Sequence, residues 1–473
     1  RASDYSRKSL YGNETYEMMR IHVAILAAGQ SLRYGSEDKL SEQVGGKSLL
    51  TILLEKIQRI SAPWKGCTVL VVSRELAKLC TDGPEICVVN GDPKRGISHS
   101  IQLALDVVQN SPHWMPGDAV CFCVCDQPFL KQGTLENMLE GYLKSGKGIG
   151  CIDRGGPKNP CVFGEQYFPE LRSLSGDVGG KKVLCRHPED VYRQKAEKEE
   201  VWDMDEKRTV IVRGGGDLAT GTSYLLAKRG YRVLVLETEH PACIRRQVAF
   251  CEAVYEGRCE VEGITARKVT NREKTIRAWE RGEIPVLVDP GCTCLSWLQP
   301  LALVDGILAK KNLGTRIDMA PLTIGLGPGF TAGVDTDLVI ETMRGESLAR
   351  VYQSGTALPN TGVPGVIDGY ASERVIYAPC SGEIRYLRQV GDLVKKGEPL
   401  AVIDGQTVCA TLTGLLRGAI REGYPVTTGL KIMDIEPRTD SNARCFLISD
   451  KALAIGGSVC RALEEWERRC LEN

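Results

Sequence analysis

Three cationic side chains, Arg33, Lys39 and Lys47, follow a short apolar run over residues 23–28 that leads into Gly29. Because the run is short and bounded by turn residues, it predicts a buried strand rather than a helix. A glycine-containing loop at the carboxyl end of such a strand brings backbone amides close to an anion, and nearby cations add to the attraction. This chemistry suits a nucleoside triphosphate, so the stretch predicts a triphosphate-binding loop.

A carboxylate stands at the end of a second predicted strand. Residues 119–125 are continuously apolar, as in a central parallel strand covered on both faces, and Asp126 follows at once. Mg²⁺ prefers one or two carboxylates together with the phosphates of its substrate. We therefore expect Asp126 to hold Mg²⁺, with Asp203 or Asp205 as the second ligand. Two plainer interpretations stay open: Asp126 caps the following helix, and the other two carboxylates lie in a solvated turn.

A second glycine-rich turn follows a strand predicted over residues 209–213. It opens a predicted helix with the spacing G-x-G-x-x-A, and an acidic residue ends the next strand about 20 positions on, as in dinucleotide-binding folds. The expected ligand loop comprises Gly214, Gly215, Gly216, Asp217 and Glu237. The alternative is that these glycines serve only the close packing of helix against strand.

Length and charge exclude several classes of protein. The chain has 473 residues, which suggests roughly three domains. Lys+Arg and Asp+Glu both number 60, so no net field attracts nucleic acid or a membrane surface, and we expect neither as a partner. The odd count of 19 cysteines in so long a chain favours a reducing, cytoplasmic location. No apolar run approaches the roughly 20 residues that span a bilayer, and residues 1–20 lack a signal-peptide core.

The pattern of apolar residues organises the chain around these motifs. Residues 21–206 and 209–374 each alternate strand-like and helix-like segments, which predicts two α/β regions with mainly parallel sheets. Residues 375–436 contain two copies of a short-strand unit, 32 positions apart, and predict a pseudo-symmetric β-sandwich of interlocked halves. From Ser449 onward, apolar residues recur every three or four positions, which predicts an amphipathic helix docked on the preceding domain or on a partner.

Three cysteines, Cys121, Cys123 and Cys125, recur with period two and so share one face of their predicted strand. Three thiols on one face could form a metal or sulfur site. We favour the plainer interpretation that they are small hydrophobic residues in a packed core.

Residues 21–206 resemble the molybdenum cofactor cytidylyltransferases, which are MocA-like members of the nucleotidyltransferase superfamily. The motifs that carry this resemblance occur in order: L-A-A-G-x-S-x-R-x-G at 26–35, K-L at 39–40, G-K-x-L-L at 46–50, G-I-S-x-S-I at 96–101, C-D-Q-P-F at 125–129, N-P-x-V-F at 159–163, L-S-G-D-x-G at 174–179 and D-M-D at 203–205. Any one motif is weak, whereas the ordered set is fairly specific.

The resemblance implies transfer of a nucleotide from a nucleoside triphosphate to the terminal phosphate of molybdopterin, with release of pyrophosphate. In that scheme Arg33 and Lys39 neutralise the triphosphate, and Asp126 holds Mg²⁺. The nucleotide-binding residues it implies are Leu26, Ala27, Ala28, Gly29, Ser31, Arg33, Lys39, Lys47, Ser98 and Ser100. Ala28 favours CTP, because GTP-using relatives tend to have a second glycine there. Asp203 and Asp205 precede Glu206-Lys207 where Thr-Pro is usual, so either remains open as the second metal ligand.

Residues 209–473 resemble the YqeB-like accessory proteins of selenium-dependent molybdenum hydroxylase systems. The motifs that carry this resemblance lie at 213–221, 236–238, 241–250, 252–254 and 434–438. No catalytic residue is carried over from it. Arg245 and Arg246, beside the glycine-rich turn, could hold an anionic pterin phosphate, or they could be solvated surface residues. Residues 378–397 also resemble a biotinyl/lipoyl-like domain, but the hairpin at 404–408 has no Lys, so no biotin or lipoate arm is expected.

The expected fold is therefore α/β and multidomain. Its expected parts are an N-terminal extension (1–20), a MocA-like nucleotidyltransferase domain (21–206), a Rossmann-like YqeB-type domain (209–374), a biotinyl/lipoyl-like β barrel-sandwich domain (375–440) and a C-terminal helix (441–473). The expected function is maturation of the molybdenum cofactor, with Mg²⁺, CTP and molybdopterin bound and a molybdenum hydroxylase apo-enzyme as a partner. Two alternatives remain: a nucleotidyltransferase for a sugar or polyol phosphate, and a non-catalytic cofactor carrier or chaperone.

Overall fold

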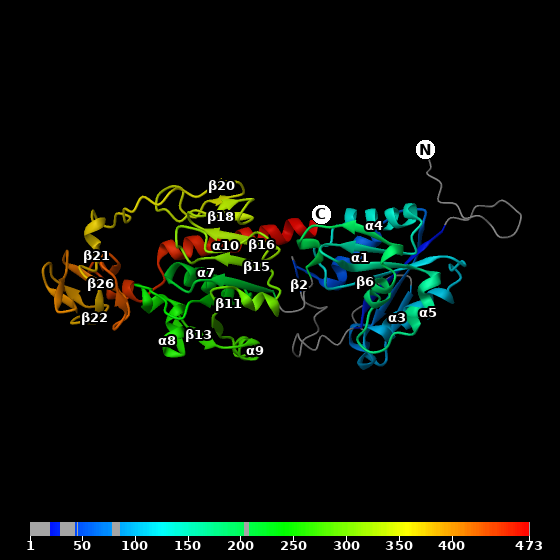
Figure 1. Ribbon diagram of the computed structural model, residues 1–473, viewed down its shortest axis with the longest axis horizontal. Helices are drawn as coiled ribbons and strands as arrows, with labels where there is room; N and C mark the ends of the chain where they lie inside the picture. The colour runs from blue at the N-terminus through cyan, green and yellow to red at the C-terminus, as the bar shows by residue number, and fades with distance from the viewer. Residues whose placement is uncertain (1–18, 29–42, 45, 78–85, 203–207, 473) are drawn as a thin grey trace, which may run out of the picture. The chain divides into compact units, whose positions relative to one another are not determined.

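The computed structural model describes residues 19–28, 43–44, 46–77, 86–202 and 208–472 (Figure 1). The chain divides into two compact units. Residues 1–207 together with 466–473 form the first unit, and residues 208–465 form the second unit. Both α/β and β segments of the second half, predicted as separate domains, fall within this single second unit.

The first unit is built on a seven-stranded sheet with the order β5-β4-β1-β6-β8-β7-β9. Its strands are β1 (Ile21–Ala27), β4 (Lys65–Val72), β5 (Ile86–Val89), β6 (Ala119–Val124), β7 (Ile149–Asp153), β8 (Pro157–Gly164) and β9 (Val191–Lys195). The first four of these in spatial order run parallel, and β8 runs antiparallel to both of its neighbours. The sheet is therefore mixed, with the parallel strand β1 near its centre.

Helices cover both faces of this sheet, because its central strands are apolar on both sides. Helices α1 (Leu49–Arg59) and α4 (Gln132–Ser145) pack on one face, and α3 (Ile97–Gln109), α5 (Phe168–Arg172) and α6 (Lys181–Arg186) pack on the other. Alternate residues of β1 enter the two cores, as the two-residue period of a strand requires. Short elements complete the unit: β2 (Gln43–Val44), β3 (Lys47–Ser48) and α2 (Arg74–Ala77).

The three cysteines of β6 and the turn after it are buried, in agreement with the interpretation that they are small hydrophobic residues in a packed core. Cys121, Cys123 and Cys125 all pack in the core between the sheet and helices α1 and α4. All 18 cysteines within the described part of the chain are free thiols. Among those residues, no group of three or more His, Cys, Asp or Glu side chains is placed to hold a metal ion, and no helix there is long and apolar enough to cross a membrane.

The second unit contains a nine-stranded sheet with the order β12-β13-β14-β11-β10-β15-β16-β18-β19. The strands are β10 (Thr209–Arg213), β11 (Arg232–Glu237), β12 (Arg258–Val261), β13 (Ile264–Val269), β14 (Ile284–Val288), β15 (Ala302–Asp305), β16 (Leu322–Leu326), β18 (Leu338–Ile340) and β19 (Val351–Tyr352). All neighbours are parallel except the antiparallel pair at each edge. Helices α7 (Asp217–Lys228), α8 (Ala253–Glu256) and α9 (Arg272–Glu280) follow β10, β11 and β13, and β17 (Thr331–Ala332) pairs with β20 (Gly355–Thr356).

Residues 375–436 form two four-stranded antiparallel sheets, β21-β28-β26-β23 and β25-β24-β22-β27. The strands are β21 (Val375–Tyr377), β22 (Gly382–Tyr386), β23 (Leu393–Val394), β24 (Pro399–Ile403), β25 (Gln406–Cys409), β26 (Gly414–Ala419), β27 (Pro425–Val426) and β28 (Lys431–Glu436). Each short strand pairs with a strand of the other repeat copy: β23 with β26, and β27 with β22. Because each sheet needs strands from both copies, neither copy can complete a sheet by itself.

The last helix, α10 (Asp450–Glu472), begins nine residues later than the segment 441–473 assigned to it from sequence. Only a short 3₁₀ turn, Asn442–Cys445, precedes it. The helix crosses α7 where glycines meet. A Cβ atom on Gly456 would lie 2.9 Å from the backbone oxygen of Gly221, and one on Gly221 would lie 2.7 Å from the Cβ of Ala452. The helix backbones can approach this closely only without side chains there.

Residues of α10 from Trp466 onward belong to the first unit rather than the second. The Trp466 ring meets Phe129 edge-on, with ring centroids 4.9 Å apart, and Trp202 stacks on Phe129 at 5.6 Å. The predicted docking of this helix on the preceding domain therefore holds only for its earlier turns.

Candidate functional site

The carboxyl edge of the first sheet brings together the two sequence motifs with the most chemistry. Strands β1 and β6 are parallel neighbours, with Leu26 opposite Val124. The chain leaves both strands at the same edge, so Ala28 and Asp126 follow side by side in the fold. The side chains of Leu26, Ala27 and Ala28 are buried, which leaves only their backbone groups to face a ligand. Asp126 is half-buried.

Several predicted site residues lie outside the described part of the chain: Gly29, Ser31, Arg33, Lys39, Asp203 and Asp205. Their assigned roles stay predictions. Asp126 alone can be tested for a fit to Mg²⁺. A half-buried carboxylate at the end of a parallel strand is the type of ligand this ion uses when it also binds phosphates.

The two predicted serines lie at the start of α3 and are buried. The Ser98 hydroxyl donates to the carbonyl oxygen of Gly176 at 2.8 Å, and the Ser100 hydroxyl accepts from the Asn90 amide at 3.0 Å. Gly96, just before α3, leaves room for this contact, because a Cβ there would lie 2.4 Å from the Gly176 carbonyl group. The structure therefore packs the motif at 96–101 directly against the motif at 174–179.

Lys47 is exposed and forms an ion pair with Glu55, with Nζ 2.8 Å from Oε1 and 2.7 Å from Oε2. Its predicted role with the triphosphate would require it to leave this carboxylate. Such a surface pair contributes little to stability, roughly 0–1 kcal/mol, so the rearrangement costs little.

One residue near Asp126 was missed from the sequence. Lys56 on α1 is buried, and its Nζ donates to the carbonyl oxygens of Pro128 at 2.8 Å and Leu130 at 2.7 Å. It thereby holds the turn that follows Asp126. Its position in the helix could have indicated that it is buried. Lys56 lies three residues after the buried Leu53 and seven after the buried Leu49, so it falls within the apolar stripe of the helix.

Burial lowers the pKa of Lys56 to about 8. In the unfolded chain a lysine titrates near 10.4, so between about pH 8 and 10 the unfolded state binds more protons and stability from this group rises with pH. We expect the unfolding midpoint of the wild type to rise relative to that of Lys56→Met as the pH increases from 7.5 to 10. Circular dichroism melts of both proteins measure this difference. The exposed Lys47→Met variant should parallel the wild type, and parallel curves for Lys56→Met would contradict the assignment.

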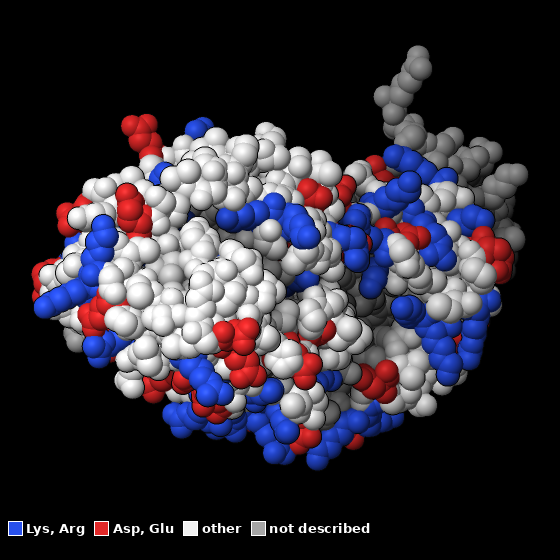
Figure 2. Space-filling model, turned by 60° about the vertical axis from the view of Figure 1, so that its left-hand side comes forward, with Lys and Arg blue, Asp and Glu red and all other residues white. Residues whose placement is uncertain are grey.

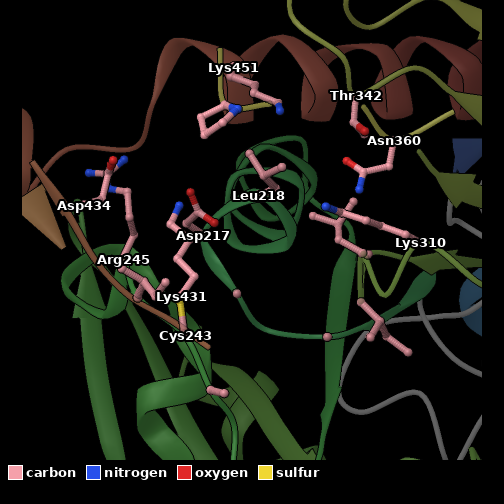
Figure 3. Close-up of a pocket in the computed structure, with 18 of the residues that line it drawn as sticks. Asp217, Leu218, Cys243, Arg245, Lys310, Thr342, Asn360, Lys431, Asp434 and Lys451 are labelled. Atoms are coloured by element: carbon pink, nitrogen blue, oxygen red, sulfur yellow. The ribbon is translucent and has the colours of Figure 1, made fainter. Parts of the chain in front are cut away.

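The second unit contains a cavity of about 1110 Å³. Four members of the predicted ligand loop line it, namely Gly214, Gly216, Asp217 and Glu237. Figure 3 shows Asp217 and Leu218 at the start of α7, with Arg245 on one side and Lys310 on the other. The glycine-rich turn after β10 therefore faces this cavity.

The same glycines also serve close packing, as the alternative interpretation predicts. A Cβ on Gly214, which has φ 89°, would lie 3.0 Å from the Gly306 carbonyl oxygen, and one on Gly215 would lie 2.9 Å from the Cys251 amide nitrogen. The Glu237 carboxylate accepts from the Gly215 amide at 2.8 Å. That amide is thus already bound within the protein and is not offered to a ligand.

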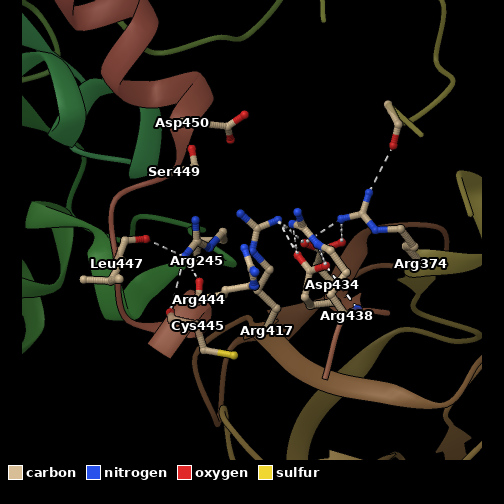
Figure 4. Close-up of polar contacts among 12 residues, drawn as sticks. Arg245, Arg374, Arg417, Asp434, Arg438, Arg444, Cys445, Leu447, Ser449 and Asp450 are labelled. Atoms are coloured by element: carbon tan, nitrogen blue, oxygen red, sulfur yellow. Dashed lines mark hydrogen bonds and ion pairs between the residues drawn. The ribbon is translucent and has the colours of Figure 1, made fainter. Parts of the chain in front are cut away.

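The two adjacent arginines predicted beside this turn point to different places. Arg245 is buried and lines the cavity, where its Nη2 donates to the carbonyl oxygens of Arg444, Cys445 and Leu447 at 3.0–3.3 Å (Figure 4). Arg246 instead donates to the carbonyl oxygen of Ala419 at 2.9 Å. Only the first of the pair can reach a ligand in the cavity.

Charged side chains of both signs occur on the face shown in Figure 2, and a broad uncharged area lies between them. This distribution agrees with the equal totals of acidic and basic residues.

Residues 23–191 match the family model of the MobA-like NTP transferase domain. This segment of the first unit is thus similar to NTP transferase domains of this class. In addition, the chain is 51% identical over 254 residues to the protein named "Uncharacterized protein YqeB" from Escherichia coli (strain K12), covering 54% of this chain and 47% of that protein. The chain therefore spans about half the length of this curated relative.

Solved structures similar to this chain include an Rv0371c homolog from Mycobacterium sp. strain JC1, with 21% identity over 40% of this chain and 91% of that one, at a TM-score of 0.33. They also include molybdopterin-guanine dinucleotide biosynthesis protein A from Archaeoglobus fulgidus, with 20% identity over 39% of this chain and 92% of that one, at a TM-score of 0.30.

Proposed function

We propose that the first unit transfers the cytidylyl group of CTP to the terminal phosphate of molybdopterin, to give the cytosine dinucleotide form of the cofactor. One observation carries the proposal: within the segment that matches the NTP transferase family, Ala28 and Asp126 follow neighbouring parallel strands at one sheet edge. That edge is where α/β sheets bind nucleotides.

In the proposed reaction an oxygen of the molybdopterin phosphate attacks the α-phosphorus of CTP. The new P–O bond forms a diphosphate bridge, and the bond to the β-phosphate breaks to release pyrophosphate. Such a transfer requires positioning and charge neutralisation more than covalent catalysis. The chain would supply backbone groups at Ala28 and Gly29 for the base and cations at Arg33 and Lys39 for the triphosphate.

Mg²⁺ belongs to the proposal as the ion that would neutralise phosphate charge when bound. Asp126 is its proposed ligand, together with Asp203 or Asp205. The second unit would serve as an accessory to a molybdenum hydroxylase, including selenium-dependent ones, and the free thiols suit the proposed reducing cytoplasm.

Pyrophosphate release tests the proposal directly. The purified full chain is incubated with Mg²⁺, one acceptor and one nucleotide chosen from CTP, GTP and ATP. We expect release with CTP and molybdopterin (or its molybdenum-loaded form), and a background rate when the acceptor is left out. Turnover only with a sugar or polyol phosphate would replace the proposal with that alternative, and preference for GTP would reverse the assignment of Ala28.

A further inference from the structure

The cavity of the second unit has an excess of positive charge. Eight Lys and Arg side chains line it, against four Asp and Glu side chains. Two of the carboxylates are already occupied by backbone amides. Glu237 accepts from Gly215 and Thr238, and Glu341 accepts from Thr342, Met343 and Leu358, all at 2.7–2.8 Å. These carboxylates stabilise loops, and their oxygens are hydrogen-bonded within the protein.

Three arginines line the cavity near one another: Arg245 and Arg374 are buried, and the Arg417 side chain is 11% exposed (Figure 4). Arg374 pairs with Asp434 at 3.0 Å, and Arg417 lies 3.6 Å from the same carboxylate. Arg245 has no carboxylate contact among the described residues and donates only to backbone carbonyls. Arg417 also lies 3.8 Å from Glu436. Asp434 and Glu436 therefore pair with Arg374 and Arg417, and an incoming anion would fit at Arg245.

Arg245 carries the strongest sign of a missing partner. Its side chain is 7% exposed, yet Nε and Nη1 have no hydrogen-bond partner within the described structure. The Nε atoms of Arg374 and Arg417 are also buried without a partner. A buried donor left unsatisfied costs roughly 1–3 kcal/mol, and more when charged, so an anion that bound here would recover that cost.

Repulsion between the positive charges around the cavity also favours a bound anion. Burial, and then the nearby Arg417 guanidinium, lower the pKa of Arg245. Burial, and then Arg344, lower the pKa of Lys451, which reaches the cavity from α10. Asp217 opposes both effects, and Figure 3 shows it close to Arg245. Asp217 is thus the internal counter-ion with which an incoming anion would compete.

Exposed apolar side chains also line the cavity. They are Ile307, Leu313, Leu358, Val363 and Val366, and each is at least 36% exposed. An inorganic ion would not use this surface, whereas an organic group attached to a phosphate would cover it. The volume of about 1110 Å³ is ample for a ligand of dinucleotide size.

From these observations we infer that the second unit binds an organic phosphate or diphosphate, with its phosphate at Arg245 and Arg417 and its organic part against the exposed apolar side chains of the lining. Arginine forks match phosphate oxygens in pairs, which suits a fixed, buried site. The inference concerns residues 208–465 alone and does not require nucleotidyl transfer by the first unit.

The test uses the full chain and two probes. Flavin mononucleotide, a flat heteroaromatic phosphate unlike CTP, is followed by fluorescence anisotropy, with riboflavin as the matched compound without phosphate. Inorganic pyrophosphate is titrated by calorimetry. We expect flavin mononucleotide to bind at least about tenfold tighter than riboflavin, because a charged hydrogen bond is worth roughly 1.5–3 kcal/mol. Pyrophosphate should bind and compete with it.

Four variants assign the site. Arg245→Gln should weaken both probes at least about tenfold, and Asp217→Asn should tighten both by removing the competing carboxylate. Arg246→Gln, the adjacent arginine that points away, should leave both affinities unchanged, and flavin mononucleotide binding that persists in Asp126→Ala places that probe outside the first unit. Unfolding midpoints show which variants are folded, and the gain in Asp217→Asn does not depend on Arg245→Gln folding.

Each contrary outcome overturns a stated part of the inference. Absence of binding by both probes, or binding unchanged in Arg245→Gln and Asp217→Asn, would overturn it entirely. Pyrophosphate binding without flavin mononucleotide binding would reduce the site to one for an inorganic ion. Binding lost in Asp126→Ala would assign the probes to the first unit, whereas failure of nucleotidyl transfer alone would leave this site intact.

Discussion

Asp126→Ala is expected to lower kcat/KM for pyrophosphate release from CTP by roughly 10²–10³-fold, the usual effect of removing one group that stabilises developing charge. The physical reason is that Asp126 is the described carboxylate at the sheet edge where Ala28 also lies. Asp126→Asn should cause a similar loss, because the amide keeps the size of the side chain but not its charge. Steady-state kinetics with CTP and molybdopterin measure both variants.

The matched control is Asp153→Asn. Asp153 also ends a strand, β7, but its carboxylate pairs with Arg193 at 3.1 Å and lies in a different part of the sheet. We expect its kinetics to stay within about twofold of the wild type, as for a surface substitution away from the site. If Asp126→Ala still delivers cofactor to a hydroxylase at the wild-type rate, this result would contradict the enzyme proposal and favour the non-catalytic carrier.

Gly456→Ala is expected to destabilise the second unit by roughly 1–3 kcal/mol, as other overpacking substitutions do. The added methyl group would lie 2.9 Å from the Gly221 carbonyl oxygen and from the Cα of Thr222, both backbone atoms of α7. Neither can move unless the two helices separate. Thermal unfolding should show a midpoint lower by several degrees, at roughly 2–4 °C per kcal/mol for a unit of this size.

The neighbouring Gly457→Ala makes the same chemical change with the opposite expected sign. A Cβ there meets only the end of the Arg461 side chain, at 3.4 Å, which can turn away. Alanine is the better helix former by up to about 1 kcal/mol, so this variant should be as stable as the wild type or more so. Equal destabilisation by both variants would mean that the helix crossing at Gly456 is looser than described.

Local patterns identified most elements that position the candidate sites. The strand that leads to Ala28, the strand before Asp126, and the glycine-rich turn after β10 all lie where apolar runs and turn residues placed them. These signals are short-range, because an apolar run and the turn that ends it are adjacent in the chain. The side chains that complete the candidate sites come from distant parts of the sequence and were not predicted.

The arginine cluster shows why. Arg245, Arg374 and Arg417 are widely spaced in sequence, and they meet only because the β domain packs on the segment after β11. That packing places the Ala419 amide on the Ile244 carbonyl oxygen at 2.9 Å. No periodic pattern of apolar residues in the sequence indicates such a contact. Lys56 is a different case, since its place in an apolar stripe was visible but a lysine there could equally extend to solvent.

The assignment of Trp466 to the first unit has a consequence for the order of folding during synthesis. Phe129 and Trp466 contact each other although 337 positions separate them. A ribosome adding roughly 5–20 residues per second needs on the order of 10–60 s to go from Trp202 to Trp466. Throughout that interval Trp202 is the only ring among the described residues made so far that stacks on Phe129. The part of the chain made first therefore completes its core last, and until then a chaperone could bind the exposed Phe129 ring.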